Sequence, residues 1–304
     1  MSSPGLSWDA MLKSTGIVLD LINDIDMQLF VEKGLRGGIS YISHRHGKAN
    51  NKYMEDYKPE IESSYLMYLD ANNLYGWAIS QPLPYGEFEW IDPDEVELFN
   101  YHEESEKGVI LEVDLEYPEE LHDLHNDYPC APEKMIVPDH MLSDYCREMK
   151  NLHGNVSGKV PKLITSLRDK KEYVLHYSNL KLYMELGLKM TNVHRVLQFS
   201  QKKWLKPYIT FNTEMRKNAK NSFEKDFFKL MNNSVFGKME NVRKRSNIKL
   251  ATEEKRFLKL VAKPLFISHE IFHENLVGFN MKYREIKLDK PSYVGMCILD
   301  LSKT

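Results

Sequence analysis

Cysteine is scarce in this sequence, with three residues among 304 that stand far apart. Cys130, Cys146 and Cys297 lack the paired spacing of a zinc site or a disulfide framework, so we expect reduced thiols. No run of 18 or more apolar residues occurs, and the first residues show no basic stretch followed by an apolar one. We therefore expect neither a membrane-spanning helix nor a signal peptide, and an intracellular protein without a membrane partner.

Internal repeats, low-complexity tracts and a Walker-type phosphate loop are also missing, which argues against a solenoid, a disordered tail and an ATPase. His122, His125 and Cys130 offer three possible metal ligands, but their spacing fits no common zinc pattern and Pro129 indicates a loop. The hydrophobic content of 42% can fill the core of one large domain or two ordinary ones. A globular fold is expected.

Charge is divided unevenly along the chain, although the formal net charge is only −3. Residues 87–139 hold 18 Asp and Glu against 2 Lys and Arg, whereas residues 202–249 hold 13 Lys and Arg against 4 Asp and Glu. The basic block is interleaved with aromatic residues, which suits a polyanion whose bases can stack. A solvated helix face would show the same charge run, so the block alone leaves both interpretations open.

The hydrophobic pattern predicts a mixed α and β fold. Residues 65–71 (YLMYLDA) and 109–115 (VILEVDL) are interpreted as strands, because their residues are β-branched or alternate in polarity. From about Trp204 the pattern becomes helical, with Asn221 and Ser222 as the break and cap between two helices. Prolines punctuate the acidic stretch, so we expect an irregular, exposed insertion there.

Asp70 follows the first of these predicted strands directly, in the stretch YLDANNLYG. A carboxylate at a strand end projects from a rigid element and can hold Mg²⁺ together with substrate phosphates. Alternatively, Asp70 begins a turn with Asn72 and Asn73 by bonding to its own backbone. Tyr75 likewise has a plain alternative as a core aromatic residue.

A second stretch, KLMNNSVFGK, lies in the predicted helix after Ser222. On a helix Lys225, Lys229 and Asn233 form one stripe that Phe236 and Gly237 continue, while most apolar residues lie on another face. Two lysines one turn apart repel each other, so an anion bound between them would be favourable.

Together these stretches resemble motifs of family-B DNA polymerases. YLDANNLYG resembles motif A, with the pattern Asp, two residues, Ser-Leu-Tyr-Pro, and KLMNNSVFGK resembles motif B, with the pattern Lys, three residues, Asn-Ser, one residue, Tyr-Gly. LRGGIS resembles the Tyr-x-Gly-Gly loop that joins the exonuclease and polymerase domains. The chain is most similar to the protein-primed group, which includes viral, organellar-plasmid and Maverick/Polinton polymerases.

The resemblance implies an α+β right-hand polymerase fold, with a partial palm built on an antiparallel sheet, helical fingers and insertions. Residues 1–64 would form the exonuclease exit and linker loop, 65–114 and 176–200 the palm, and 115–175 a terminal-protein-type insertion. Residues 201–240 would form the fingers, and 241–304 a palm continuation with a possible second insertion near 246–275.

It also implies a role for individual residues. Asp70 and the carbonyl of Ala71 would bind Mg²⁺, Lys229 would hold the triphosphate as the second catalytic residue, and Tyr75 would act as the steric gate. The implied nucleotide-binding set is Leu74, Tyr75, Lys217, Lys225, Lys229, Asn233, Phe236 and Gly237. The implied DNA-binding set is Arg36, Gly37, Gly38, Ser234 and Lys238. The implied partners of a monomer are primer-template DNA, dNTPs and a terminal protein, in the nucleus or wherever a viral or mobile element replicates.

Four positions depart from the family patterns: Leu35 replaces Tyr, Asn73 replaces Ser, Gly76 replaces Pro and Phe236 replaces Tyr. The Tyr-x-Asp-Thr-Asp-Ser hairpin of motif C, which supplies the second metal-binding Asp, has no counterpart, and Asp300 in ILDLSKT does not resemble it. The exonuclease motifs are missing too. We therefore expect an internal fragment with little activity of its own; alternatively, the chain is a degenerate remnant that binds only DNA or nucleotide.

Overall fold

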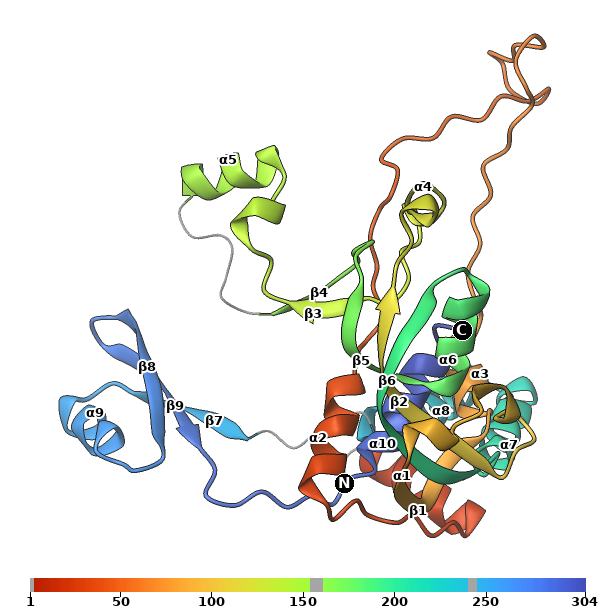
Figure 1. Cartoon of the computed structure of the whole chain (residues 1–304). Helices are drawn as coiled ribbons and strands as arrows, with labels where there is room; N and C mark the ends of the chain where they lie inside the picture. The colour runs from red at the N-terminus through yellow and green to blue at the C-terminus, as the bar shows by residue number, and fades with distance from the viewer. Residues whose placement is uncertain (1–2, 154–160, 240–244) are drawn as a thin grey trace.

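A four-stranded antiparallel sheet forms the centre of the molecule, in the order β1 (Leu83–Ile91), β6 (Lys189–Lys202), β2 (Lys107–Glu116), β5 (Lys170–His176) (Figure 1). The computed structural model describes residues 3–153, 161–239 and 245–304, without the side chain of Lys238. The strand predicted at 109–115 is confirmed, since it lies within β2. Long β6 pairs with both β1 and β2, so it joins the two halves of the sheet.

Alternation along the paired strands produces two separate cores. Ile110 pairs with Leu197 and belongs to the larger core, whereas the next pair, Leu111 and Val196, belongs to the second core. Successive side chains of a strand point to opposite faces, so each face of the sheet is covered. The larger core includes residues of α1 (Ser3–Thr15), α2 (Ile25–Gly34), α3 (Leu74–Ile79), α7 (Lys206–Lys217), α8 (Ser222–Met239) and α10 (Ser292–Leu301), and the second includes α6 (Tyr177–Glu185).

Helices α7 and α8 form an antiparallel hairpin, and the predicted break between them is confirmed. Asn221 rather than Ser222 is the capping residue: its Oδ1 accepts from the Glu224 amide at 2.9 Å. The Glu224 carboxylate in turn accepts from the amide of Lys220, also at 2.9 Å. The first bond satisfies an amide that the first helical turn leaves free, and the second ties the residue before the cap to the helix, so the helix begins where the sequence indicates.

The expectation of an irregular, exposed acidic middle is wrong for its first half. Both β1 and β2 lie in residues 83–116, and the two strands are separated by the short 3-10 helices η1 (Pro93–Glu95) and η2 (Leu98–Asn100). Acidic Glu112 is buried in β2, where its carboxylate pairs with Lys33 and Arg195 at 2.7 Å each. Partners distant in the sequence therefore allow an acidic segment to form a central strand.

Between β2 and β5 the chain leaves the central sheet. It forms η3 (Glu119–Leu121), α4 (His122–His125), β3 (Glu133–Met135), η4 (Asp139–Met141), α5 (Asp144–His153) and β4 (Lys162–Ile164). Antiparallel β3 and β4 make a sheet of their own. Figure 1 shows this region above the central sheet, with α5 set well apart from it.

A small second unit follows α8. Strands β7 (Ser246–Ala251), β9 (Leu276–Lys282) and β8 (Phe266–His273) form an antiparallel sheet in that order, and α9 (Glu254–Val261) packs on it through a core containing Phe279 and Leu260. Figure 1 shows this unit away from the central sheet. Among the described residues, no helix combines the length and apolar character needed to cross a bilayer.

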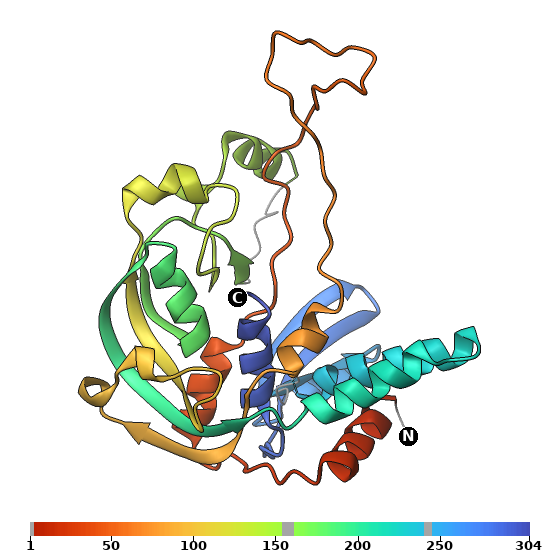
Figure 2. The ribbon, with the colours of Figure 1, turned by 90° about the vertical axis from the view of Figure 1, so that its right-hand side faces the viewer.

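The strand predicted at residues 65–71 does not form, and this expectation is wrong. Residues 61–75 are exposed, and Tyr68 is 94% exposed. A strand needs a neighbour to bond its backbone amides and carbonyls, but the described strands contain no partner for 65–71. The nearest pairing is an isolated bridge between Asn50 and Ser64 at the far end of a long loop, drawn in orange in Figure 2.

Candidate functional site

The segment after Asp70 turns sharply into helix α3. Asn73, the residue before this helix, has left-handed backbone dihedral angles (φ 58°, ψ 41°), a conformation that Asn tolerates better than most residues. The Asn73 side chain occupies the space that a Cβ on Gly76 would fill. The two departures from the motif A pattern therefore fit each other, because the Asn73 side chain requires glycine at position 76. The sequence signal for this turn is the Asn pair before the helix, and a turn with Asn72 and Asn73 was the alternative interpretation given for this stretch.

The structure brings the two motif segments into contact through one pair of rings. Tyr75 of α3 and Phe236 of α8 stack with their centroids 4.8 Å apart and their planes inclined by 33°. Tyr75 is 39% exposed, so part of its ring remains open to solvent. Leu74, directly before it, is also exposed. Phe236 keeps the aromatic face that the usual tyrosine would supply, and this face supports Tyr75.

Helix α8 separates its polar and apolar residues as predicted, but only along its second half. Buried residues recur there at Met231, Val235 and Met239, one turn apart. In the first half the apolar face is open, and Phe223 is 77% exposed. The first half of α8 therefore projects beyond the core, as Figure 2 shows.

The other side of α8 is a row of exposed positions. Lys225, Lys229, Asn233 and Gly237 follow one another at four-residue intervals, and all four are exposed. Exposed Lys217 ends the neighbouring helix α7. In the described part of the chain, the side chains of these three lysines form no hydrogen bond or ion pair within the protein. Their ammonium groups are therefore available to an anion.

Asp70 is exposed and, among the described residues, has no hydrogen-bond or ion-pair partner. Ala71 is exposed beside it. Across the described ranges, no group of three or more His, Cys, Asp and Glu side chains gathers to hold a metal ion. One free carboxylate is nevertheless compatible with Mg²⁺, which often binds through one or two carboxylates and completes its shell with phosphates and water.

Two of the residues in the implied DNA-binding set are buried. Arg36 is 5% exposed; its guanidinium stacks on the Tyr173 ring at 3.8 Å and donates to the carbonyls of Lys33 and Val174. This placement favours a structural role for the arginine side chain. Ser234 is also buried, and the Lys238 side chain lies outside the described residues.

Gly37 and Gly38 follow Arg36, and a Cβ at either position would meet open space. The backbone just before them is fixed by two lysines from distant elements. Lys134 donates to the Leu35 carbonyl at 2.8 Å, and Lys303 donates to the Arg36 carbonyl at 2.9 Å. The backbone before the glycine pair is therefore held in place by these two lysines, while the glycines themselves have open space around them.

Asp300 is buried in α10 and serves the fold. It is 1% exposed, accepts from the His176 amide at 2.9 Å and pairs with Lys303 at 3.0 Å. Burial lowers the pKa of the His176 imidazole to about 4, against an opposing effect of Asp300, so this histidine is neutral at pH 7. Asp300 is thus occupied by structural partners, which agrees with the interpretation that it does not replace the missing carboxylate.

The loosely spaced His and Cys residues form a hydrogen-bonded cluster around Tyr117. The Tyr117 hydroxyl lies 2.8 Å from Nδ1 of His125 and accepts from the Cys130 amide at 3.1 Å. Burial raises the pKa of Tyr117 well above its usual value. In the structure His125 and Cys130 therefore belong to a buried hydrogen-bonded cluster around Tyr117.

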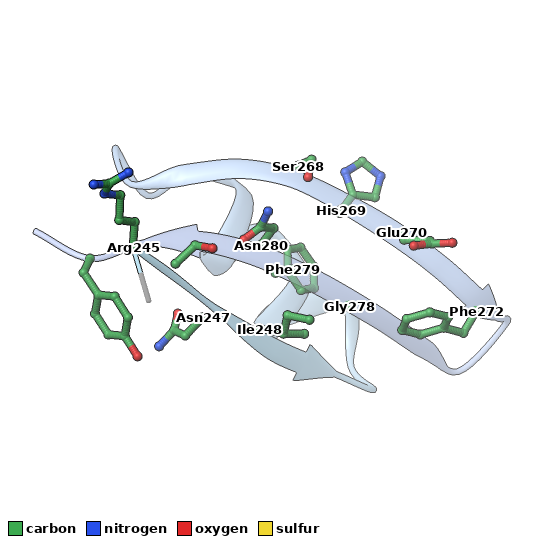
Figure 3. A pocket seen from close by; sticks show the side chains of 12 residues that line it. Arg245, Asn247, Ile248, Ser268, His269, Glu270, Phe272, Gly278, Phe279 and Asn280 are labelled. Atoms are coloured by element: carbon green, nitrogen blue, oxygen red, sulfur yellow. The ribbon is translucent and has the colours of Figure 1, made fainter. Parts of the chain in front are cut away.

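One cavity of about 790 Å³ lies on the open face of the small β7-β9-β8 sheet (Figure 3). Arg245, Asn247, Ile248 and Asn280 are among its lining residues, and the Phe272 ring occupies the space that a side chain on Gly278 would need. None of the residues predicted to bind nucleotide, DNA or metal lines this cavity. The cavity is therefore separate from the contact between Tyr75 and Phe236.

Comparison with known proteins gives one family and one fold. The sequence profile of the family described as DNA polymerase type B, organellar and viral, matches residues 24–275. No curated protein is detectably similar to the chain. Phi29 DNA polymerase shares the fold: its post-translocation binary complex with primer-template DNA has 16% sequence identity and a TM-score of 0.54, over 99% of this chain and 43% of that one.

Two other Phi29 DNA polymerase structures agree. The orthorhombic crystal form has 15% identity and a TM-score of 0.57, over 98% of this chain and 43% of that one. The ternary complex with primer-template DNA and incoming nucleotide substrates has 16% identity and a TM-score of 0.52, over the same shares of the two chains. The chain thus spans less than half the length of these proteins.

Proposed function

Since the chain belongs to the organellar and viral type B DNA polymerases, we propose that it is part of a DNA-dependent DNA polymerase and takes part in template-directed nucleotidyl transfer from dNTPs. The observation that carries the proposal is the contact between Tyr75 and Phe236, because it joins the two motif segments at one place. The fold that the chain shares with Phi29 DNA polymerase, a protein crystallised with primer-template DNA and nucleotides, supports it.

In this proposal the nucleotide binds between α3 and the exposed row of α8. Lys229 holds the triphosphate, with Lys225 and Lys217 adding positive charge, and Asn233 and Gly237 lie along the nascent base pair. Lysines without protein partners are suited to this task, since an anion between them removes their mutual repulsion. Tyr75, supported by Phe236, forms the steric gate under the sugar, and Leu74 adjoins it.

Asp70 and the carbonyl of Ala71 are the residues that would hold Mg²⁺. When bound, the metal ions polarise the attacking and leaving oxygens of the phosphoryl transfer. Asp70 has no competing partner in the described part of the chain, which fits such a role. Because Asp70 is a single carboxylate, we expect little or no primer extension by this chain alone; robust synthesis that Asp70→Asn abolishes would contradict that expectation.

The template side of the site is assigned to Gly37 and Gly38, whose backbone is open, and to the second half of α8 with Lys238. Ser234 is buried beside it, so its contribution would be to pack this half of the helix. Arg36 then contributes by fixing the start of the glycine loop. We also propose that replication is primed by a terminal protein, which residues 115–175 would bind, in a viral or mobile element. The acidic start of that region would suit a basic protein.

A second candidate function is binding of DNA or nucleotide without catalysis. The single free carboxylate at the proposed metal site favours it over full catalysis in the isolated chain. Primer extension and nucleotide binding, measured side by side, separate the two functions.

The DNA-binding part of the proposal is tested by titrating labelled primer-template DNA with the chain at several KCl concentrations. Binding should weaken steeply with salt, and Lys238→Met should lower the slope of log K against log [salt] by about 1. Lys13→Met is a matched control, because Lys13 is an exposed lysine outside the basic block. Binding that is insensitive to salt, or equal effects of both variants, would contradict the assignment.

A further inference from the structure

Helix α1 packs against the hairpin formed by α7 and α8, more than 190 residues away in the sequence (Figure 2). Its contact with α8 is polar at one point. The Ser7 hydroxyl donates to the Met231 carbonyl at 2.5 Å and lies 3.3 Å from the Tyr208 hydroxyl. Tyr208, in α7, also donates to the Ser7 carbonyl at 3.4 Å. One serine therefore links α1 to both helices of the hairpin.

This link lies inside an apolar interface. Ser7 is 0% exposed and Tyr208 is 3% exposed, while Met11, Met231 and Val235 belong to the core around them. A buried hydroxyl without a partner costs free energy, so two hydroxyls in such a place are tolerated only in an arrangement that satisfies both. The contact therefore defines how α1 sits on α8 more strictly than apolar packing alone would.

The half of α8 that α1 contacts carries Asn233, Phe236 and Gly237 of the proposed nucleotide-binding residues, whereas Lys225 and Lys229 lie in the first half. Met231, Val235 and Met239 face the core, and the exposed positions Asn233 and Gly237 lie between them on the opposite side. In the first half of α8, by contrast, the apolar residues Phe223, Phe227 and Leu230 remain exposed. A fixed second half and a free first half meet near Met231, where Ser7 binds.

We propose that Ser7 and Tyr208 are positioning residues, and that α1 is a brace which fixes the Asn233–Gly237 segment of α8 relative to Tyr75. The proposal rests on the function proposed above as far as nucleotide binding is concerned. The brace itself is a property of the free protein. The Ser7 hydroxyl donates to the Met231 carbonyl. In a regular helix this carbonyl also accepts from the amide of residue 235. Loss of the Ser7 hydroxyl should therefore loosen the helical turn that leads to Phe236.

The test uses hydrogen exchange of the free chain and binding of Mg²⁺·dATP in parallel. Ser7→Ala and Tyr208→Phe should each speed amide exchange in residues 231–239 about fivefold, while exchange in β2 stays unchanged. Both variants should weaken Mg²⁺·dATP binding by about three- to fivefold. Thr15→Ala is the matched control, since the Thr15 hydroxyl donates to the Met11 carbonyl within α1 itself at 2.9 Å.

The outcomes separate the two proposals. Unchanged exchange in residues 231–239, or equal acceleration in β2 and in the Thr15→Ala control, overturns the brace, because the first shows no coupling and the second shows general destabilisation. If the unmodified chain binds no Mg²⁺·dATP, the proposed function fails and the exchange data alone decide on the brace. Faster exchange together with unchanged dATP affinity would overturn the positioning role.

Discussion

The two motif segments of this protein are built in opposite ways. Residues 229–237 lie in a capped helix whose inner side is buried, whereas residues 65–70 lie in an exposed stretch that no described strand pairs with. A helix satisfies its backbone hydrogen bonds within itself, while a strand depends on a neighbour. The comparison teaches that local sequence signals are enough to form the helical segment, whereas a strand at residues 65–70 would need a tertiary partner.

The largest expected effect is a difference in the free energy of unfolding between a variant in the buried segment and a variant in the exposed one. Val235→Asp should lower the free energy of unfolding by at least about 3 kcal/mol, because an unpaired carboxylate enters a dry core. Tyr68→Asp should change it by less than about 0.5 kcal/mol, since Tyr68 is exposed. Urea unfolding of both variants measures the difference. A large loss in Tyr68→Asp would mean that the segment is covered in solution, and the comparison would break.

Gly237→Ala separates folding from binding within α8. A Cβ at this position meets no atom within 4 Å, so alanine should raise the free energy of unfolding by about 0.5–1 kcal/mol. If a base pair approaches this backbone, the same change should weaken binding of Mg²⁺·dATP with primer-template DNA about tenfold, or about 1.4 kcal/mol. Equal affinity in the more stable variant would remove Gly237 from the site.

A smaller effect is expected at the start of α8. Asn221→Ala removes the acceptor for the Glu224 amide and should cost about 1 kcal/mol of helix stability. Asn218→Ala is the control, because the Asn218 side chain forms no hydrogen bond within the described residues. Amide exchange in residues 222–228 should rise only in the first variant. Similar exchange in both would show that the predicted cap does not hold this helix.

The sequence predicted α8 well because its signals are local. Asn221 and Glu224 stand three residues apart at the helix start, and the four-residue spacing of Lys225, Lys229 and Asn233 describes their common face. Strand β2 was predicted for a similar reason, since its apolar residues form a nearly continuous run. Both elements could be located without knowing what they contact.

The errors arose where distant partners decide the structure. Strand β1 lies in the acidic stretch that was expected to be irregular. In the neighbouring β2, Glu112 is buried between Lys33 and Arg195, which lie 79 and 83 residues away. Residues 65–71 looked like a strand, yet nothing in that stretch says whether a neighbour is present. The DNA-binding role of Arg36 was implied by the resemblance of LRGGIS to the Tyr-x-Gly-Gly loop and stays a prediction; the stacking of its guanidinium on Tyr173 is a contact that this resemblance does not indicate.

The candidate site was predicted in its residue types but not in its contacts. The resemblance to polymerase motifs selected both Tyr75 and Phe236, although no spacing rule relates residues this far apart in the chain. The fit of Asn73 against Gly76 was also invisible, because it depends on the left-handed conformation of Asn73. The first contact is tertiary and the second depends on a local backbone conformation, so the structure was needed to reveal both.

The central claim is that the two motif segments hold one nucleotide, and a double-mutant cycle tests it most directly. The dissociation constant of Mg²⁺·dATP is measured for the unmodified chain, Asp70→Asn, Lys229→Met and the double variant. If both side chains act on the same triphosphate, each single change weakens binding and the two effects couple by at least about 1 kcal/mol. Effects that add to within about 0.3–0.5 kcal/mol, or no loss in either single variant, would contradict the account.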